Sequence, residues 1–477
     1  MPLTNQLKNQ HLLWRAAFGP MAENANELEQ VSQKDLFKLL QKTSSKKPTP
    51  LSVANNALDG LVKGIGVLGK MEKPTDDQRR QMRKQSASDL KDLNLTWLSE
   101  MINSEAQLRE KMSLFWHGHF ACRIINIYYQ QQLLNSIRGN ALENFGDLLR
   151  EVSKSPAMLS FLNNQQNKKE HPNENFAREV MELFTMGRGN YSEEDIKEAA
   201  RAFTGWGFKA SGEFVDRKNF HDNGEKTFLG KKGKFDGDDI LDIILEQKAT
   251  AKFITAKLYK YFVNEKVDDQ IVSSLAEDFY NSNYNIQILM TAIFTSDWFY
   301  EEKNIATIIK SPVALLVGIR RLIPMELEVP QSQLLFERAL GQVLFYPPNV
   351  AGWPGGKSWI DSSALMLRMR LPQILTNAED FAIKPKDDDD VMMGMQGVDT
   401  KAKKQELPVN VDWKRVVQVF EKTPRDLLMD KLNAVVLQTR GTIPSTILNR
   451  YIDNTSREGF IKTAIVQLMS TPEYQLS

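Results

Sequence analysis

The residues with the chemistry to bind a metal ion or transfer a proton are concentrated in three short motifs. They are Phe-Trp-His-Gly-His-Phe at 115–120, His-Pro-Asn-Glu-Asn-Phe-Ala-Arg-Glu at 171–179, and Phe-His-Asp at 220–222. Imidazole beside carboxylate and guanidinium groups is the chemistry of metal ligation and proton transfer. The sequence therefore indicates where a site would lie, but not which reaction takes place there.

The first motif falls in a segment with helical period, which separates its two imidazoles. At 100° per residue His119 lies on the apolar arc of residues 108–123, whereas His117 points the opposite way, near Glu110. A His-x-His pair chelates one ion from a strand, but not from a regular helix. His119 is either a core histidine with one buried partner or a ligand or proton shuttle completed by another helix. His117 is interpreted as a surface or inter-helix contact.

The second motif predicts a helix with a polar ridge. Glu174, Arg178 and Glu182 recur at i, i+4 and i+8, and Glu179 lies beside Glu182. Such a ridge is either a solvated face with weak ion pairs or a buried polar network in which the arginine clamps a carboxylate. The absence of lysine between residues 172 and 188, in a chain rich in lysine elsewhere, favours the buried network.

The third motif continues into Asp-Asn-Gly, which predicts a turn that is either purely structural or supplies a ligand or catalytic group. We predict that the three motifs meet around one cavity. The candidate catalytic residues are Arg178, Glu179, Glu182, His221 and Asp222. The candidate ligands of a divalent ion such as zinc, manganese or iron are His117, His119, Glu182 and His221.

The elements that must position these residues are mostly helices. A helix is expected over 104–136, where Ser104 begins a capping-box pattern, and another over 173–187. Glycine and Asx turns between short strands predict a small β-hairpin insertion near 205–235. Further helices are predicted over 192–204, 237–262, 268–280, 284–297, 305–323 (with Pro312 in its first turn or at a kink), 332–344, 361–377, 412–420, 424–438 and 459–470. The predicted fold is therefore a large, mostly α-helical body.

One segment is poor in residues that form a core. Residues 384–411 contain four consecutive aspartates and lysine-rich flanks, with almost no aromatic residues. This composition predicts a flexible linker. It would separate a main helical domain, 1–383, from a C-terminal helical segment, 412–477.

Composition excludes several classes of protein. The net charge of +1 over 477 residues provides no overall field to attract nucleic acid. The single cysteine, Cys122, excludes an intramolecular disulfide and a thiolate-cluster zinc site. The longest apolar stretch, 313–319, is far short of the roughly 20 residues that span a bilayer. With no apolar stretch of signal-peptide length at the N-terminus, we expect a cytoplasmic protein without membrane insertion, or an exported one whose leader has been removed.

Two further motifs have structural interpretations. Gly-Ile-Gly-Val-Leu-Gly at 64–69 matches a nucleotide-binding fingerprint, but no strand precedes it and no βαβ unit surrounds it. The loop from Pro347 to Gly356, followed by Trp359, would either wall a pocket or form a corner packed by two tryptophans, and the corner is favoured.

Several of these motifs, in this order, resemble the bacterial family known as domain of unknown function 1800. The matching stretches are His-Leu-Leu-Trp-Arg-Ala-Ala-Phe-Gly at 11–19, then 115–120, 173–183, Thr-Gly-Trp at 204–206, 220–222 and Pro-Pro-Asn-Val-Ala-Gly-Trp-Pro at 347–354. The resemblance covers roughly residues 5 to 375 and leaves the C-terminal segment unmatched. It implies a predominantly helical fold without an agreed reaction, cofactor or ligand set. It also implies a partner that is sulfatase-like and is encoded by a neighbouring gene. The resemblance further implies frequent export, and this N-terminus departs from that pattern.

Two functions follow from the motifs. The first is an enzyme acting on a small molecule of unknown identity, such as a metal-dependent hydrolase in which metal-bound water is the nucleophile and a spare glutamate is the base. A metal-free acid–base site made of the same residues is a variant of it. The second is a non-catalytic binding or assembly protein in which the buried His/Glu/Arg network is structural.

Overall fold

The computed structural model describes residues 3–54, 75–209, 211–377, 407–439 and 443–477. The glycine-rich motif at 64–69 and residues 384–406 of the predicted linker lie outside these ranges.

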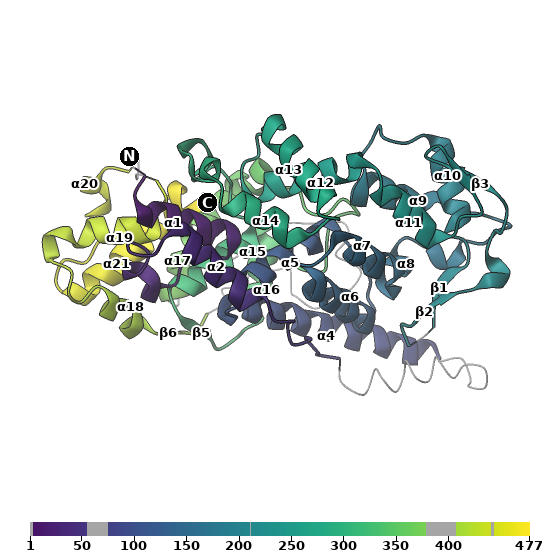
Figure 1. Cartoon of the computed structure of the whole chain (residues 1–477). Helices are drawn as coiled ribbons and strands as arrows, with labels where there is room; N and C mark the ends of the chain where they lie inside the picture. The colour runs from purple at the N-terminus through teal and green to yellow at the C-terminus, as the bar shows by residue number, and fades with distance from the viewer. Residues whose placement is uncertain (1–2, 55–74, 210, 378–406, 440–442) are drawn as a thin grey trace.

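The protein is mostly α-helical, as predicted, and elongated (Figure 1). The α-helices are α1 (Asn5–Ala16), α2 (Gln33–Ser44), α4 (Asp76–Asn103), α5 (Gln107–His119), α6 (Ile127–Asn140), α7 (Phe145–Lys154), α8 (Pro156–Phe161), α9 (Glu174–Glu179), α10 (Glu193–Ala202), α11 (Gly237–Leu245), α12 (Lys248–Phe262), α13 (Asp269–Asn281), α14 (Ile286–Phe294), α15 (Pro312–Leu322), α16 (Ser332–Leu340), α17 (Ser362–Asn377), α18 (Trp413–Val419), α19 (Leu428–Val436), α20 (Ser445–Leu448) and α21 (Arg457–Met469). In the described ranges no helix combines the length and the apolar character needed to cross a bilayer.

The strands form three two-stranded antiparallel sheets. The predicted insertion contains two hairpins rather than one: β1 (Trp206–Phe208) pairs with β2 (Phe214–Asp216), and β3 (Lys226–Phe228) pairs with β4 (Lys231–Gly233). The second hairpin turns through Leu229 and Gly230, both with positive φ, as a two-residue turn requires. The third sheet was not predicted, because β5 (Met325–Leu327) and β6 (Val409–Val411) are far apart in the sequence.

Side-chain caps decide where several predicted helices divide. The segment 104–136 is not one helix: α5 ends at His119, and α6 begins after Asn126, whose side chain accepts a hydrogen bond from the Tyr129 amide. The segment 237–262 likewise divides into α11 and α12. Pro312 occupies the first turn of α15, where its missing N–H costs no hydrogen bond.

The two ends of the chain lie together. Figure 1 shows α18 to α21 beside α1 at one end of the molecule, with the hairpins β1 to β4 at the other. Gln10 of α1 donates to the Val435 carbonyl of α19 at 2.7 Å. One hydrophobic cluster joins Trp14 and helices α15 to α17 with α18, α19 and α21. The described part of the C-terminal segment therefore packs on the body of the protein and shares its core.

Candidate functional site

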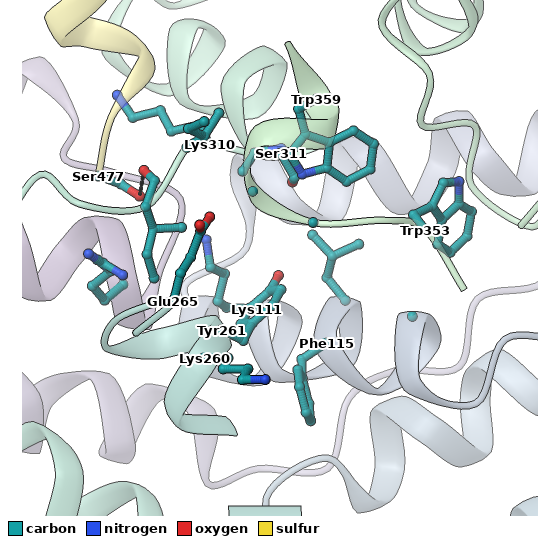
Figure 2. Close-up of a pocket in the computed structure, with 18 of the residues that line it drawn as sticks. Lys111, Phe115, Lys260, Tyr261, Glu265, Lys310, Ser311, Trp353, Trp359 and Ser477 are labelled. Carbon is teal, nitrogen blue, oxygen red and sulfur yellow. Dashed lines mark hydrogen bonds between the residues drawn. The ribbon is translucent and has the colours of Figure 1, made fainter. Parts of the chain in front are cut away.

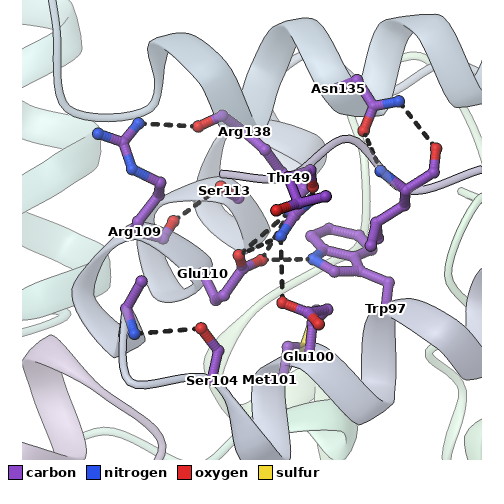
Figure 3. Close-up of polar contacts among 12 residues, drawn as sticks. Thr49, Trp97, Glu100, Met101, Ser104, Arg109, Glu110, Ser113, Asn135 and Arg138 are labelled. Carbon is purple, nitrogen blue, oxygen red and sulfur yellow. Dashed lines mark hydrogen bonds and ion pairs between the residues drawn. The ribbon is translucent and has the colours of Figure 1, made fainter. Parts of the chain in front are cut away.

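Helix α5, which carries both histidines of the first motif, is held by a buried ion pair. Glu110 accepts from the Arg138 guanidinium of α6 at 2.7 Å and from the Trp97 indole of α4 at 2.9 Å (Figure 3). The side chains of Glu110 and Arg138 are each 1% exposed. A buried carboxylate is tolerated only when its oxygens are paired and hydrogen-bonded in this way. The network fixes α5 between α4 and α6.

His117 belongs to the packing around this network. Its Nε2 accepts from the Phe345 amide at 3.2 Å, and its ring lies 5.1 Å from that of Trp97. Burial lowers the pKa of His117 to about 3, so the ring is neutral. His117 is therefore an inter-element contact, as interpreted from the helical wheel, and its Nε2 is already engaged.

His119 has two specific partners. Its Nε2 donates to the Phe184 carbonyl at 3.1 Å, so Nδ1 carries no proton and accepts from the Lys257 amine of α12 at 3.2 Å. Burial, together with the charge of Lys257, lowers the pKa of His119 well below its ordinary value. The neutral imidazole thus joins α5 to two other elements in one fixed tautomer.

The carbonyls at this junction come from a stretch of π-helix. The helix of the second motif changes from α9 to a π-helix over Val180–Thr185, and the Thr185 hydroxyl donates to the Val180 carbonyl five residues back. The Leu183 carbonyl accepts from Lys257 at 3.0 Å, next to the Phe184 carbonyl that accepts from His119. The first motif therefore meets the helix that continues the second motif through backbone carbonyls and not through carboxylates.

The polar ridge of the second motif faces outward. Arg178, 35% exposed, pairs with Glu174 and Glu193. Glu182 accepts from Arg188 at 2.5 Å and from the Tyr191 hydroxyl at 3.1 Å. This arrangement differs from the buried network expected here, because the apolar arc takes the core side of the helix and leaves Arg178 and Glu174 partly exposed, while the Glu182 side chain is 14% exposed beneath Arg188.

Glu179 is half-buried beside Glu182 on the same ridge. Burial, reinforced by the Glu182 charge, raises the pKa of Glu179. No hydrogen bond of the Glu179 side chain is seen within the described residues that would connect it to either of the other motifs.

His221 and Asp222 form a separate cluster at the hairpins. His221 is buried and donates from Nδ1 to the Thr204 carbonyl at 3.0 Å. Asp222 pairs with Arg201 of α10 at 2.8 Å and accepts from the Gly224 amide, which is the Asx turn that the sequence indicates. Within the described ranges, no hydrogen bond or ion pair joins His221 to His119 or Glu182.

The predicted metal ligands are consequently not gathered. In the described part of the chain, no group of three or more His, Cys, Asp or Glu side chains is arranged to hold a metal ion. Each candidate ligand instead has a separate protein partner: the Phe345 amide for His117, Lys257 for His119, Arg188 for Glu182 and the Thr204 carbonyl for His221.

His119 and Lys257 line a cavity of about 460 Å³ between α1, α5, α12 and the loop before α17. Figure 2 shows this cavity with Phe115, Tyr261 and Trp359 among the labelled residues of its wall. Aromatic side chains form much of its wall: Trp14, Phe115, Tyr261, Trp353 and Trp359. Five basic side chains also line it, Arg15, Lys111, Lys257, Lys260 and Lys310, against the single carboxylate side chain of Glu265. The cavity is therefore aromatic and lined mainly by basic groups.

Arg15 is the most constrained of these cations. It is 2% exposed and donates from Nη2 to the Asn304 carbonyl, while its Nε and Nη1 are buried without a hydrogen-bond partner. Burial lowers the pKa of Arg15 to about 9, although the Glu265 charge acts in the opposite direction. An unsatisfied guanidinium beside a cavity costs free energy unless a ligand occupies the cavity and accepts from it.

Two lysines extend the cluster of cations. Lys111 donates to the Trp14 carbonyl at 3.3 Å, and burial, with the charge of Arg15, lowers its pKa to about 7. The Lys310 amine lies 3.4 Å from the centre of the Trp14 ring, and burial, with the charges of Arg368 and Lys111, holds its pKa well below the ordinary value. Within the described residues neither lysine forms an ion pair.

The loop before α17 closes the cavity. Gly352 has φ +85°, and a Cβ added there would lie 2.4 Å from the Gly118 carbonyl oxygen of α5. Only glycine permits this close approach, which places Trp353 and Trp359 at the wall. The loop therefore walls a pocket, whereas the sequence analysis favoured a packed corner.

Sequence reasoning did not select Arg15, Lys111, Lys257 or Glu265. Arg15 falls within the matched stretch at 11–19, where it is the one cation among apolar residues, and Lys111 follows Arg109 and Glu110 shortly before the first motif. A single cation in an apolar helix segment is the one available signal. It is weak, because lysine and arginine stems also lie along apolar surfaces while their charges remain in water.

The comparisons with known proteins establish the family. The model of the family described as Protein of unknown function (DUF1800) matches residues 11–476, nearly the whole chain, so the protein belongs to this family. The match includes the C-terminal helical segment, for which the sequence motifs had given no resemblance. No curated protein and no solved structure matches the chain.

Proposed function

We propose that the protein is an enzyme that binds a small organic anion with a flat apolar part in the cavity between α5, α12 and the 351–359 loop. The observation that carries the proposal is Arg15, a buried guanidinium with two unpartnered nitrogens beside the cavity. Lys111 and Lys310 add basic groups whose charged forms burial disfavours and a bound anion would stabilise, while Glu265 is the one carboxylate side chain in the lining. An anionic ligand would satisfy these groups, and the aromatic wall would cover its ring.

We do not propose that this enzyme is the metal-dependent hydrolase that the histidines suggested. The donor set described above does not fit a shared ion, since every candidate ligand has its own partner elsewhere. A metal-free site is supported better, because His119 and Lys257 offer a neutral imidazole and an amine at the cavity. The sulfatase-like partner remains a prediction from the family resemblance.

Calorimetric titration with simple probes tests the binding. We expect benzoate and phenyl phosphate to bind saturably, and phenol and benzyl alcohol at least tenfold more weakly. Arg15→Met and Lys111→Met should each weaken benzoate binding at least tenfold, whereas Lys252→Met, an exposed position on α12, should not. Lys111→Met loses one hydrogen bond, to the Trp14 carbonyl, whereas Arg15→Met loses those to the Asn304 carbonyl and the Thr307 hydroxyl. Lys111→Met should therefore fold even if Arg15→Met does not. Equal affinity for the charged and neutral probes would contradict the proposal and favour the non-catalytic assembly protein.

A further inference from the structure

The Lys257 amine is held in one orientation at the cavity wall. It donates to the Leu183 carbonyl at 3.0 Å and to His119 Nδ1 at 3.2 Å. Both are acceptors, and no carboxylate pairs with the amine within the described residues. A neutral amine has two N–H bonds and one lone pair. The Leu183 carbonyl and His119 Nδ1 accept the two N–H bonds, so neither of these groups engages the lone pair of the nitrogen.

The surroundings raise the fraction of Lys257 that is a neutral amine. Burial, with the positive charge of Lys260 on the same helix, lowers the pKa of Lys257 to about 8. Desolvation and a neighbouring cation are the two means by which proteins activate a lysine nucleophile. His119 cannot donate to the amine, because the Phe184 carbonyl fixes its proton on Nε2.

We infer that Lys257 is a nucleophile that forms an imine with the carbonyl carbon of an aldehyde or ketone bound in the cavity. This inference rests on the proposed function for the nature of the ligand. The Lys257 nitrogen forms a bond to the carbonyl carbon and loses both of its protons in turn, the first toward His119 Nδ1, which already accepts an N–H from it. The carbinolamine oxygen takes up these two protons and leaves as water, so that amine and carbonyl give imine and water without an oxidant or reductant.

The other cavity lysines are less suited to this role. The Lys310 amine is enclosed between the rings of Trp14 and Tyr474 and donates to the Tyr474 carbonyl. Lys111 lies over the Phe18 ring without an imidazole to take its proton. Lys260 is exposed. Lys257 alone among these four combines partial burial with two fixed acceptors, one of which is a neutral imidazole.

Reductive trapping tests the inference on the full chain. The protein is incubated with cyanoborohydride and either 4-formylbenzoate or benzaldehyde, and modified peptides are identified by mass spectrometry. We expect Lys257 to be labelled at least tenfold faster than Lys252, the exposed lysine on the same helix. Lys257→Met should abolish this fast labelling, and Lys252→Met should leave it unchanged. His119→Gln, which retains polarity but not the base, should slow it at least fivefold.

The two aldehydes separate this inference from the proposed function. Fast labelling of Lys257 by both aldehydes at equal rates would support the nucleophile while contradicting the anion site. Labelling of Lys257 no faster than that of Lys252, in a protein that binds benzoate, would overturn the nucleophile and leave the anion site intact. Preferential labelling by 4-formylbenzoate would support both.

Discussion

His119 donates from Nε2 to the backbone carbonyl of Phe184, 3.1 Å away, and this contact joins the two most polar motifs of the chain. The carboxylates that suggested a shared metal site point away from it, toward Arg188 and Tyr191. What the second motif supplies to the cavity is a π-helical stretch with two carbonyls that fix His119 and Lys257. The motif thus acts through its backbone.

The buried ion pair of Glu110 and Arg138 is predicted to be a major contributor to stability. Glu110→Ala leaves a guanidinium that is 1% exposed without its carboxylate, which should cost about 3–5 kcal/mol. Urea unfolding followed by circular dichroism measures the loss. A loss below about 1 kcal/mol would mean that Arg138 finds another partner or water.

The ridge arginine should behave in the opposite way. Arg178→Ala breaks pairs with Glu174 and Glu193 that are substantially exposed, so it should lower the free energy of unfolding by less than about 1 kcal/mol. The same urea titration gives the value. A cost comparable to that of Glu110→Ala would restore the idea of a buried network on this helix.

Gly352 is predicted to be essential for the shape of the cavity. Gly352→Ala imposes a positive φ on alanine and drives its Cβ against the Gly118 carbonyl, which should cost at least about 1–2 kcal/mol and displace Trp353. Benzoate affinity and thermal unfolding report the two effects. Gly355→Ala is the matched control, because a Cβ there meets nothing within 4 Å and the backbone is extended. Equal behaviour of the two variants would contradict the close approach.

Glu337 is predicted to make stability depend on pH. Burial raises its pKa from 4.5 to about 8, although Asn94 and the Leu344 amide donate to it. Between these values the unfolded chain has released the proton that the folded chain retains. The contribution of Glu337 to the free energy of unfolding therefore falls as pH rises from about 4.5 to about 8, at most by about 1.4 kcal/mol per unit.

The comparison of wild type with Glu337→Gln isolates this effect. The variant does not titrate at this position, so its stability relative to wild type should rise steadily from pH 4.5 to 8 in urea titrations. Glu328→Gln, at an exposed position, controls for the loss of one carboxylate. Parallel pH profiles for Glu337→Gln and wild type would show that Glu337 is ionised in the folded protein.

Lys111 is predicted to make anion binding depend on pH. Its pKa is about 7 in the protein without ligand, and only its charged form attracts an anion. The affinity for benzoate should therefore fall as pH rises above about 7, by up to tenfold per unit until the amine is neutral in the complex as well. Calorimetry from pH 5.5 to 8.5 tests this. Lys111→Met should bind more weakly at pH 6 and lose most of the dependence above pH 7.

The sequence by itself determined the helical framework and the hairpin region, and it limited Pro312 to the first turn of a helix or a kink. These features depend on residue period, capping and turn chemistry, which act over a few neighbouring residues. The polar ridge at Arg178 and the apolar arc of the same helix were also visible, although the ridge was expected to be buried. The helical period could not show whether the ridge is a solvated face or a buried polar network, because both give the same sequence pattern.

Only the tertiary structure determined which residues line the cavity. Arg15, Lys111 and Lys257 belong to three distant segments, and any one of them could have reached water. They become an unpaired cluster only because α1, α5 and α12 pack together and Gly352 lets the loop close over α5. The charge of a site depends on which residues are buried together, and that is fixed by long-range packing.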